Sequence, residues 1–262
     1  MFPKIRKVAV LGAGVMGSGI AAHLANAGIP CLMLDIVPPS LADEEKKKGV
    51  TEKSPAFRNR FALNGLEGIR KSRPSLLYSQ KDLGLISIGN FEDDFPKIAE
   101  CDWIIEVVVE NLKIKQALYG RIEAMWKPGV VVSSNTSGIA IAQMMEGRGA
   151  DFRRHFLVTH FFNPVRYMKL LELVAGRDTD PAILSGMADF GERVLGKGIV
   201  YGKDTPNFVG NRVGVFAMMY AMHAMLEDGL TIDEVDRILR EVIGPRHGKR
   251  VENFLRRLLS DM

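Results

Sequence analysis

The first residues of this sequence that could do chemistry form a glycine-rich hexapeptide near its start, Gly12-Ala13-Gly14-Val15-Met16-Gly17. In a loop of this pattern the first glycine permits a tight turn, and the second lets the backbone approach a pyrophosphate. The third lets a helix pack closely on a sheet. The helix that follows offers N–H groups and partial positive charge to phosphates at its N-terminus. The motif therefore predicts a dinucleotide-binding loop.

An aspartate follows this loop at about the distance expected of a residue that bonds a ribose. Asp35 ends the strand-like run Cys31–Asp35, and an acid roughly 20 residues beyond the glycines accepts hydrogen bonds from the ribose diol. A carboxylate at this position also repels a 2′-phosphate. The next residues, Ile36-Val37-Pro38-Pro39, offer no cation to hold that phosphate. We therefore expect NAD, and not NADP, as the cofactor.

Alternating strands and helices must position these residues. Strand-like apolar runs cover Lys7–Leu11, Cys31–Asp35, Trp103–Val108, Val130–Ser133, Phe156–Phe161 and Leu170–Val174. Helical patterns separate most of these runs, among them Gly14–Ala27, Leu112–Met125 and Ile139–Met145. The alternation predicts an α/β fold with a Rossmann-like, doubly wound, mostly parallel sheet that carries helices on both faces.

The last part of the chain has a helical pattern instead. We expect Thr205 to cap a methionine-rich helix over Asn207–Asp228, with Pro206 at its first position. Thr231–Glu234 forms a capping box that opens another helix. The predicted organisation is therefore an NAD-binding Rossmann domain over residues 1–203, with a helical insertion at 36–82, and a short α-helical domain over 204–262.

Composition places the chain among ordinary globular proteins. Of its 262 residues 47% are hydrophobic and 25% are charged, and these values exclude wholesale disorder, collagen and coiled coil. The net charge of +4 is too small to make nucleic acid the default partner. We expect no signal peptide at the start of the sequence, because Met1–Lys4 leads directly into a strand-like run, and no apolar run is long enough to span a membrane.

Cysteines and histidines give no sign of a disulfide framework or a metal site. The two cysteines, Cys31 and Cys101, lie far apart in the sequence, which fits a reducing, cytoplasmic compartment. Four histidines show no ligand spacing and are interpreted as structural residues: His23, His155, His223 and His247. We therefore expect no bound metal.

Five ordered motifs resemble those of the 3-hydroxyacyl-CoA dehydrogenase family. Three look like its active-site signature: Ser134-Asn135-Thr136-Ser137, His160-Phe161-Phe162-Asn163-Pro164 and Lys169-Leu170-Leu171-Glu172. Glu106–Lys115 and Lys203–Arg212 resemble further family motifs. The resemblance runs from about Lys4 to about Gly244. The insertion and the Asn90–Asp94 run are most similar to the long bacterial multidomain members used in fatty-acid β-oxidation.

This resemblance implies the oxidation of a (3S)-3-hydroxyacyl-CoA to the 3-oxoacyl-CoA, with hydride passing to NAD. The reaction needs a base for the hydroxyl proton, and the family's base matches His160. An imidazole titrates near neutral pH, so it can take and return that proton. Glu172 matches the family's partner carboxylate, which fixes the tautomer and stabilises the imidazolium. Without the resemblance, a lone histidine beside two phenylalanines is more often structural.

The resemblance also assigns polar residues around this pair. Ser137 matches a hydrogen-bond partner of the substrate hydroxyl, and Asn211 matches an amide that the second domain contributes to the site. Glu110 and Lys115 match residues beside the nicotinamide ribose, for which an exposed helix start is the structural alternative. Further polar residues of the same cofactor pocket match Asn135 and Asn163.

The long segment between Ile36 and Asp82 is polar, basic and helical in pattern, and we expect it to project beside the end of the sheet. A solvated face is the ordinary interpretation of such a charge run. Coenzyme A carries several phosphate charges, and the family binds it with a helical segment after the second strand. The resemblance therefore implies a coenzyme A contact here, with Arg58, Arg60, Lys71 and Arg73 as candidates.

The match to the family ends after Ile243, so the helical domain is truncated relative to the family. Family members commonly dimerise through the helical lobe. The resemblance therefore implies a homodimer, but this chain has only part of the lobe that would form it. Two alternatives stay open. One is an NAD(H)-binding protein without turnover, either a remnant or a structural relative like the family's crystallins. The other is a dehydrogenase of a small free acid, which needs a lysine in the long helix, and Asn207–Asp228 contains none.

Overall fold

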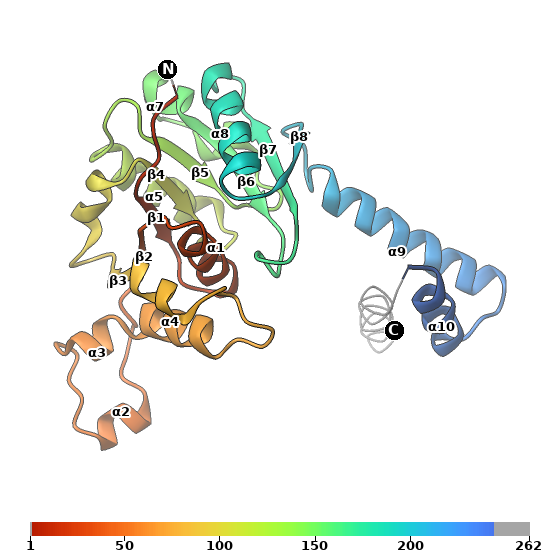
Figure 1. The fold of residues 1–262 in the computed structure, drawn as a ribbon, viewed down its shortest axis with the longest axis horizontal. Coiled ribbons are helices and arrows are strands. Elements are labelled where there is room, and N and C mark those ends of the chain that lie inside the picture. Colours follow the sequence, from red (N-terminus) through yellow and green to blue (C-terminus); the bar gives the residue numbers. More distant parts are fainter. Residues whose placement is uncertain (1, 244–262) are drawn as a thin grey trace. The chain divides into compact units, whose positions relative to one another are not determined.

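The first part of the chain folds around one eight-stranded sheet. The computed structural model describes residues 2–243, and the chain divides into a first unit that ends at Phe208 and a second that begins at Val209. The strands of the first unit lie in the order β3-β2-β1-β4-β5-β6-β7-β8 (Figure 1). Their bounds are β1 Val8–Leu11, β2 Cys31–Asp35, β3 Ile86–Asn90, β4 Trp103–Glu106, β5 Val131–Ser134, β6 Phe156–Phe161, β7 Leu170–Ala175 and β8 Gly198–Gly202.

Helices cover both faces of this sheet. Side chains of β1 alternate between the two cores: Val8 and Val10 pack with α1 and α8, whereas Ala9 and Leu11 pack with α5, α6 and α7. All four are fully buried, as expected of a parallel strand covered on both sides. The helices concerned are α1 Val15–Asn26, α5 Leu112–Glu123, α6 Ile141–Met144, α7 Ala150–Arg154 and α8 Pro181–Arg193, with short 3₁₀ turns η1 Gln80–Leu85 and η2 Phe95–Glu100.

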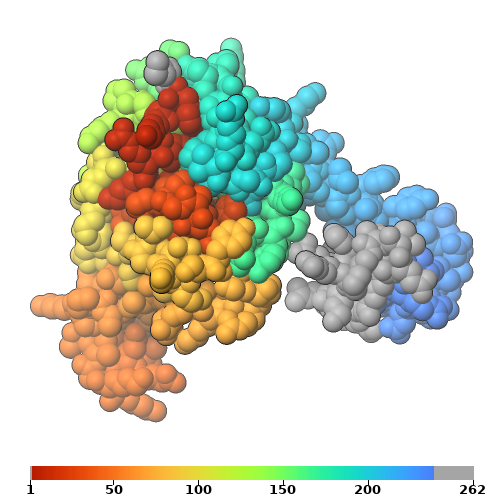
Figure 2. All heavy atoms as spheres, in the orientation of Figure 1, coloured from red at the N-terminus to blue at the C-terminus, as the bar shows by residue number. Residues whose placement is uncertain are grey.

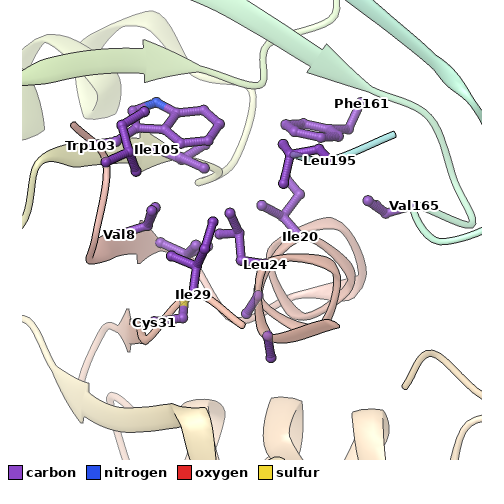
Figure 3. Close-up of a cluster of buried hydrophobic side chains, with 14 of the residues drawn as sticks. Val8, Ile20, Leu24, Ile29, Cys31, Trp103, Ile105, Phe161, Val165 and Leu195 are labelled. Atoms are coloured by element: carbon purple, nitrogen blue, oxygen red, sulfur yellow. The ribbon is translucent and has the colours of Figure 1, made fainter. Parts of the chain in front are cut away.

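The first of these cores joins α1 to the middle of the sheet. Figure 3 shows Ile20 and Leu24 of α1 among the side chains of Trp103, Ile105 and Phe161, which come from β4 and β6. All five are at most 2% exposed. This packing fixes the start of α1, and with it the glycine-rich loop, relative to the ends of β4 and β6.

Strand directions confirm the predicted Rossmann-like, doubly wound fold. Every neighbouring pair is parallel except β6 and β7, which are antiparallel. All the predicted strands form, with ends within about two residues of those expected. The strands β3 and β8 were not predicted. Both lie at sheet edges, and their sequences ISIGN and GIVYG contain glycine and lack a continuous apolar run.

The insertion after β2 is helical, as predicted, but only its first half projects. It contains α2 (Asp43–Lys47), α3 (Pro55–Arg58) and α4 (Arg60–Lys71). Helix α2 has no buried residue, and Figure 2 shows the orange α2–α3 segment standing out from the first unit. Helix α4 instead packs on α1, because Ala62, Gly65 and Ile69 form a buried stripe along it.

The tightest contact of α4 is with the glycine-rich loop itself. A Cβ on Gly65 would lie 2.7 Å from both the carbonyl oxygen of Ala13 and the hydroxyl of Ser18. Gly68, one turn further along, has no neighbour within 4 Å of its Cβ position. Of these two glycines, only Gly65 brings the backbone of α4 against the glycine-rich loop.

The loop between β6 and β7 joins the insertion to the sheet. The Arg166 guanidinium donates hydrogen bonds to the carbonyl oxygens of Ser75 (2.6 Å) and Leu77 (2.9 Å), which follow α4. From the sheet side, the buried Lys197 ammonium donates to the carbonyl oxygen of Val165. Burial lowers the pKa of Lys197 to about 8. The loop is thus held from two sides.

In the second unit, α9 (Gly210–Glu227) is followed by α10 (Ile232–Ile243). The predicted capping box opens α10: the N–H of Glu234 donates to the Thr231 hydroxyl (3.3 Å), and the Glu234 carboxylate accepts from the Thr231 N–H (2.8 Å). This reciprocal pair satisfies two donors at the helix start.

The expected start of the long helix at Pro206 is wrong. Helix α9 begins at Gly210, because Asn207 and Phe208 have φ angles of 64° and 41°. Those values lie in the left-handed region, where a helix cannot continue. The side chain of Phe208 is only 2% exposed, so its burial in the first unit holds this uncommon backbone conformation in place.

We expect Gly65→Ala to lower the free energy of unfolding by about 1–3 kcal/mol through overpacking against the glycine-rich loop. Gly68→Ala is the matched control and should gain up to about 1 kcal/mol, because alanine favours a helix over glycine. Thermal unfolding and NADH titration of both variants measure the effect. Equal stability of the two variants would contradict the supporting role of α4.

Candidate active site

The glycine-rich loop connects β1 to α1 at the carboxyl end of β1. Gly12 has a φ of 120°, and a Cβ there would lie 2.5 Å from the carbonyl oxygen of Val107. A Cβ on Gly17 would lie 1.8 Å from the carbonyl oxygen of Gly12. A Cβ on Gly14 would meet nothing within 4 Å. This open backbone, at the N-terminus of α1, fits a pyrophosphate.

A pocket of about 550 Å³ opens beside this loop. Asp35 lies at its edge: its carboxylate accepts from the N–H of Ala13 (2.6 Å) and from that of Ile36 (2.7 Å). The carboxylate thereby ties the end of β2 to the loop after β1. Met16 is partly buried against the core behind the pocket. The lining consists of Ala13, Gly14, Val15, Ser18, Asp35, Ile36, Phe61, Asn64, Gly65, Gly68 and Leu76.

Farther along the sheet, His160 of β6 faces Glu172 of β7. The antiparallel register places the two residues directly opposite each other, and the imidazole Nδ1 lies 2.7 Å from the Glu172 carboxylate. The Glu172 side chain is fully buried and that of His160 is 6% exposed. A carboxylate can only accept here, so Nδ1 carries the hydrogen and Nε2 presents its lone pair.

Two aromatic rings and one hydroxyl surround the imidazole. The rings of Phe162 and Phe208 lie 4.5 Å and 5.7 Å from it between centroids. The Ser137 hydroxyl lies 3.4 Å from Nε2. The aromatic rings thus cover the imidazole on two sides, and the Ser137 hydroxyl is the polar group beside the Nε2 lone pair.

The loop that carries Ser137 is fixed by its own polar contacts. Glu110 accepts hydrogen bonds from the Thr136 hydroxyl and from the Ser137 N–H (3.1 Å). Partial burial raises the pKa of Glu110, but the Thr136 hydrogen bond and the nearby Lys115 charge outweigh it and lower this pKa overall. Asn135 accepts from the N–H of Phe161 (2.9 Å). These contacts tie the loop after β5 to the end of β6.

Lys115 is not an exposed residue of a helix start. Its side chain is 1% exposed, and its ammonium lies 2.7 Å from Glu106 and 3.3 Å from Glu110. Glu106, Tyr119, Ser134 and Thr136 are buried parts of this cluster that sequence reasoning missed. Two sequence features could have indicated this cluster. A charged residue, Glu106, ends the apolar run WIIE, and Lys115 and Tyr119 lie four residues apart on one face of a helix.

The structure does not test the roles of two of the predicted site residues. Asn163 follows β6 on the exposed loop, and Asn211 is the second residue of α9, in the second unit; both assignments stay predictions. Of the candidate coenzyme A contacts, Arg73 makes no ion pair among residues 2–243. The other three pair with carboxylates of the first unit: Arg58 with Glu92 and Asp93, Arg60 with Glu45, and Lys71 with Glu67.

Of the other described histidines, His23 and His155 bond backbone carbonyl oxygens. Nε2 of His23 bonds the carbonyl oxygen of Leu195 (2.9 Å), and burial lowers the pKa of His23 to about 4. His155 bonds the carbonyl oxygen of Asp151. His223 is exposed on α9, and His247 lies outside the described residues. Within residues 2–243, no group of His, Cys, Asp and Glu side chains could hold a metal ion.

Both cysteines are buried free thiols. Burial raises the pKa of Cys31 well above its ordinary value and that of Cys101 to about 12. Neither thiol therefore has the character of a reactive thiolate. Of the helices in the described part of the chain, none is both long and apolar enough to cross a membrane.

Comparison of the sequence with known proteins identifies the family to which it is similar. The model of "3-hydroxyacyl-CoA dehydrogenase, NAD binding domain" matches residues 7–205. A probable 3-hydroxyacyl-CoA dehydrogenase of Bacillus subtilis is 53% identical over 244 residues, which are 93% of this chain and 31% of that protein. A putative fatty acid oxidation complex trifunctional enzyme of Rickettsia prowazekii is 34% identical over 241 residues, 92% of this chain and 32% of that protein.

A solved structure supports the same match. The 3-hydroxybutyryl-CoA dehydrogenase of Escherichia coli superposes with a TM-score of 0.73 at 26% identity, over 91% of this chain and 46% of that one. The chain spans about a third of the length of the two curated relatives named here. The matched region is an NAD-binding domain, and NAD is therefore its cofactor.

We expect Asp35→Ala to weaken NADH binding about tenfold and to reduce the preference for NADH over NADPH, because an acceptor and a negative charge are both lost. Asp35→Asn keeps an acceptor for the Ala13 N–H and removes only the charge. It should lose preference and keep most of its affinity. Fluorescence titration with NADH and NADPH distinguishes the two effects, and an unchanged affinity ratio in both variants would refute the role of the charge.

Proposed function

The chain belongs to the 3-hydroxyacyl-CoA dehydrogenase family, and we propose that it oxidises a (3S)-3-hydroxyacyl-CoA to the 3-oxoacyl-CoA in fatty-acid β-oxidation. The observation that carries this proposal is the buried His160–Glu172 pair, in which Nε2 of His160 lies 3.4 Å from the Ser137 hydroxyl. NAD, when bound, accepts the hydride from C3 of the substrate. The glycine-rich loop and Asp35 would hold it, with Glu110, Lys115, Asn135 and Asn163 on its nicotinamide side.

In this mechanism His160 is the general base. Its Nε2 takes the proton of the 3-hydroxyl group as the C3–O bond becomes a carbonyl. Glu172 holds the hydrogen of Nδ1, fixes the tautomer, and stabilises the imidazolium that forms. Ser137 donates to the substrate oxygen and orients the hydroxyl toward Nε2. In the reverse direction the same imidazolium returns the proton to the oxygen.

The environment of the pair suits this role. Glu172 is fully buried, so its attraction for the imidazolium acts in a medium of lower polarity than water. Phe162 and Phe208 restrict water access to the ring. Asn211 is the residue that the second unit would add to this site, and homodimerisation and a cytoplasmic location belong to the same proposal. An NAD(H)-binding protein without turnover is the alternative.

The first test is NADH oxidation by the full chain with acetoacetyl-CoA, and with free acetoacetate as the control. We expect turnover that requires the coenzyme A ester, because the described contacts of His160 are with Ser137, Glu172, Phe162 and Phe208, and none of these is a cation that could hold a small free carboxylate. NADH binding without any oxidation would favour the alternative of an inactive relative. Equal turnover of free acetoacetate would refute the acyl-CoA substrate.

We expect His160→Gln to lower kcat at least about a hundredfold, because the general base is lost, with NADH affinity changed by less than about threefold. Glu172→Gln should have nearly the same effect, because an amide holds the imidazole poorly and does not stabilise its cation. Steady-state kinetics and NADH titration measure both quantities. Near-normal kcat in either folded variant would refute the pair as the proton-transfer group.

A further inference from the structure

A second buried polar cluster lies between the cofactor loop and the loop of Ser137. Its centre is the carboxylate of Glu106, the last residue of β4, which is fully buried. One oxygen accepts from the Lys115 ammonium (2.7 Å) and the Val108 N–H (2.8 Å). The other accepts from the hydroxyls of Tyr119 (2.5 Å) and Ser134 (2.6 Å). Four donors thus compensate for the burial of one negative charge.

The hydrogen bond from the Val108 N–H leads to the cofactor loop. Val108 belongs to the turn after β4, and the carbonyl oxygen of Val107 in that turn is the atom against which Gly12 packs. The Val107 N–H itself donates to the carbonyl oxygen of Leu11 (2.8 Å). The Glu106 carboxylate therefore shapes the surface on which the dinucleotide loop makes its tight turn.

The contacts of Glu106 with Lys115 and Ser134 lead to Ser137 by two routes. Lys115 contacts Glu110, and Glu110 in turn accepts from the Thr136 hydroxyl and the Ser137 N–H. The Ser134 hydroxyl, which donates to Glu106, accepts from the N–H of Thr136 (3.1 Å). Both routes end at Thr136 and Ser137, and the Ser137 hydroxyl lies beside Nε2 of His160.

We propose that Glu106 is a positioning residue for the reaction: its carboxylate fixes the cofactor loop and the Ser137 loop in one arrangement. This inference rests on the proposed function only for its catalytic readout. The geometry specifically requires the negative charge, since Lys115 is an ammonium with 1% exposure that has only Glu106 and Glu110 as carboxylate partners among the described residues.

The test compares Glu106→Gln, Lys115→Met and the double variant of the full chain. Glu106→Gln keeps the shape of the side chain and removes its charge. We expect it to raise the dissociation constant of NADH about tenfold and to lower kcat with acetoacetyl-CoA by about tenfold or more. In the Lys115→Met background, Glu106→Gln should cost less than about threefold further, because coupled residues do not act additively.

Glu123→Gln is the matched control. Glu123 lies on the same helix, α5, and forms a partly buried ion pair with Arg148 (2.9 Å) that has no contact with either loop. We expect this variant to lower the melting temperature without a change in kcat or in NADH affinity. A general loss of stability in α5 would therefore move only the melting temperature, whereas the loss of positioning moves the kinetic and binding constants.

Two outcomes would overturn the proposal: wild-type NADH affinity and kcat in folded Glu106→Gln, or losses that multiply independently in the double variant. If Glu106→Gln does not fold, Ser134→Ala provides the test. It should lower kcat with NADH affinity within about twofold, and an unchanged kcat would be contrary to the proposal. Absence of wild-type turnover would contradict the proposed function alone, because NADH affinity still reports on Glu106.

Discussion

The antiparallel pairing of β6 with β7 is the constraint on which the candidate active site depends. The strands β1 to β6 all run in the same direction, so residues at their carboxyl ends meet at one edge of the sheet. The reversal at β7 brings the amino-terminal part of that strand to the same edge. His160 and Glu172 consequently face each other across one register position, although the chain between them makes a complete turn.

The other parts of the site are arranged around that pair by the parallel strands. The loops after β1, β4 and β5 all leave the sheet at the edge where β6 ends. The glycine-rich loop, Glu106 with its partners, and Ser137 therefore lie along the same edge of the sheet. The buried ion pair between Glu106 and Lys115 lies among these loops. Burial of a charged group costs free energy unless its donors and acceptors all have hydrogen-bond partners. For Glu106 and Lys115, several of those partners belong to the loops that form the site.

The sequence predicted the sheet and the His160–Glu172 pair from different kinds of information. Long apolar runs such as Phe156–Phe161 predict strands directly, whereas the opposition of His160 and Glu172 came from a resemblance, because spacing alone does not fix strand direction. Glu106 was missed because its partners are distant in sequence and their contacts depend on the fold. The start of α9 was also wrong, since burial of Phe208 overrides the local signals of Thr205 and Pro206.

The two-sided support of the β6–β7 loop has an evolutionary consequence. Arg166 bonds carbonyl oxygens of the segment after α4, and Lys197 bonds those of the loop itself. Carbonyl acceptors belong to the backbone, so these hydrogen bonds depend on the length and path of the Ser75–Leu77 segment, whereas its side chains matter through the burial of Leu77. Lineages that lengthen or shorten the insertion must therefore remodel the loop beside the active site in concert, and chimeras between relatives need both segments from the same parent.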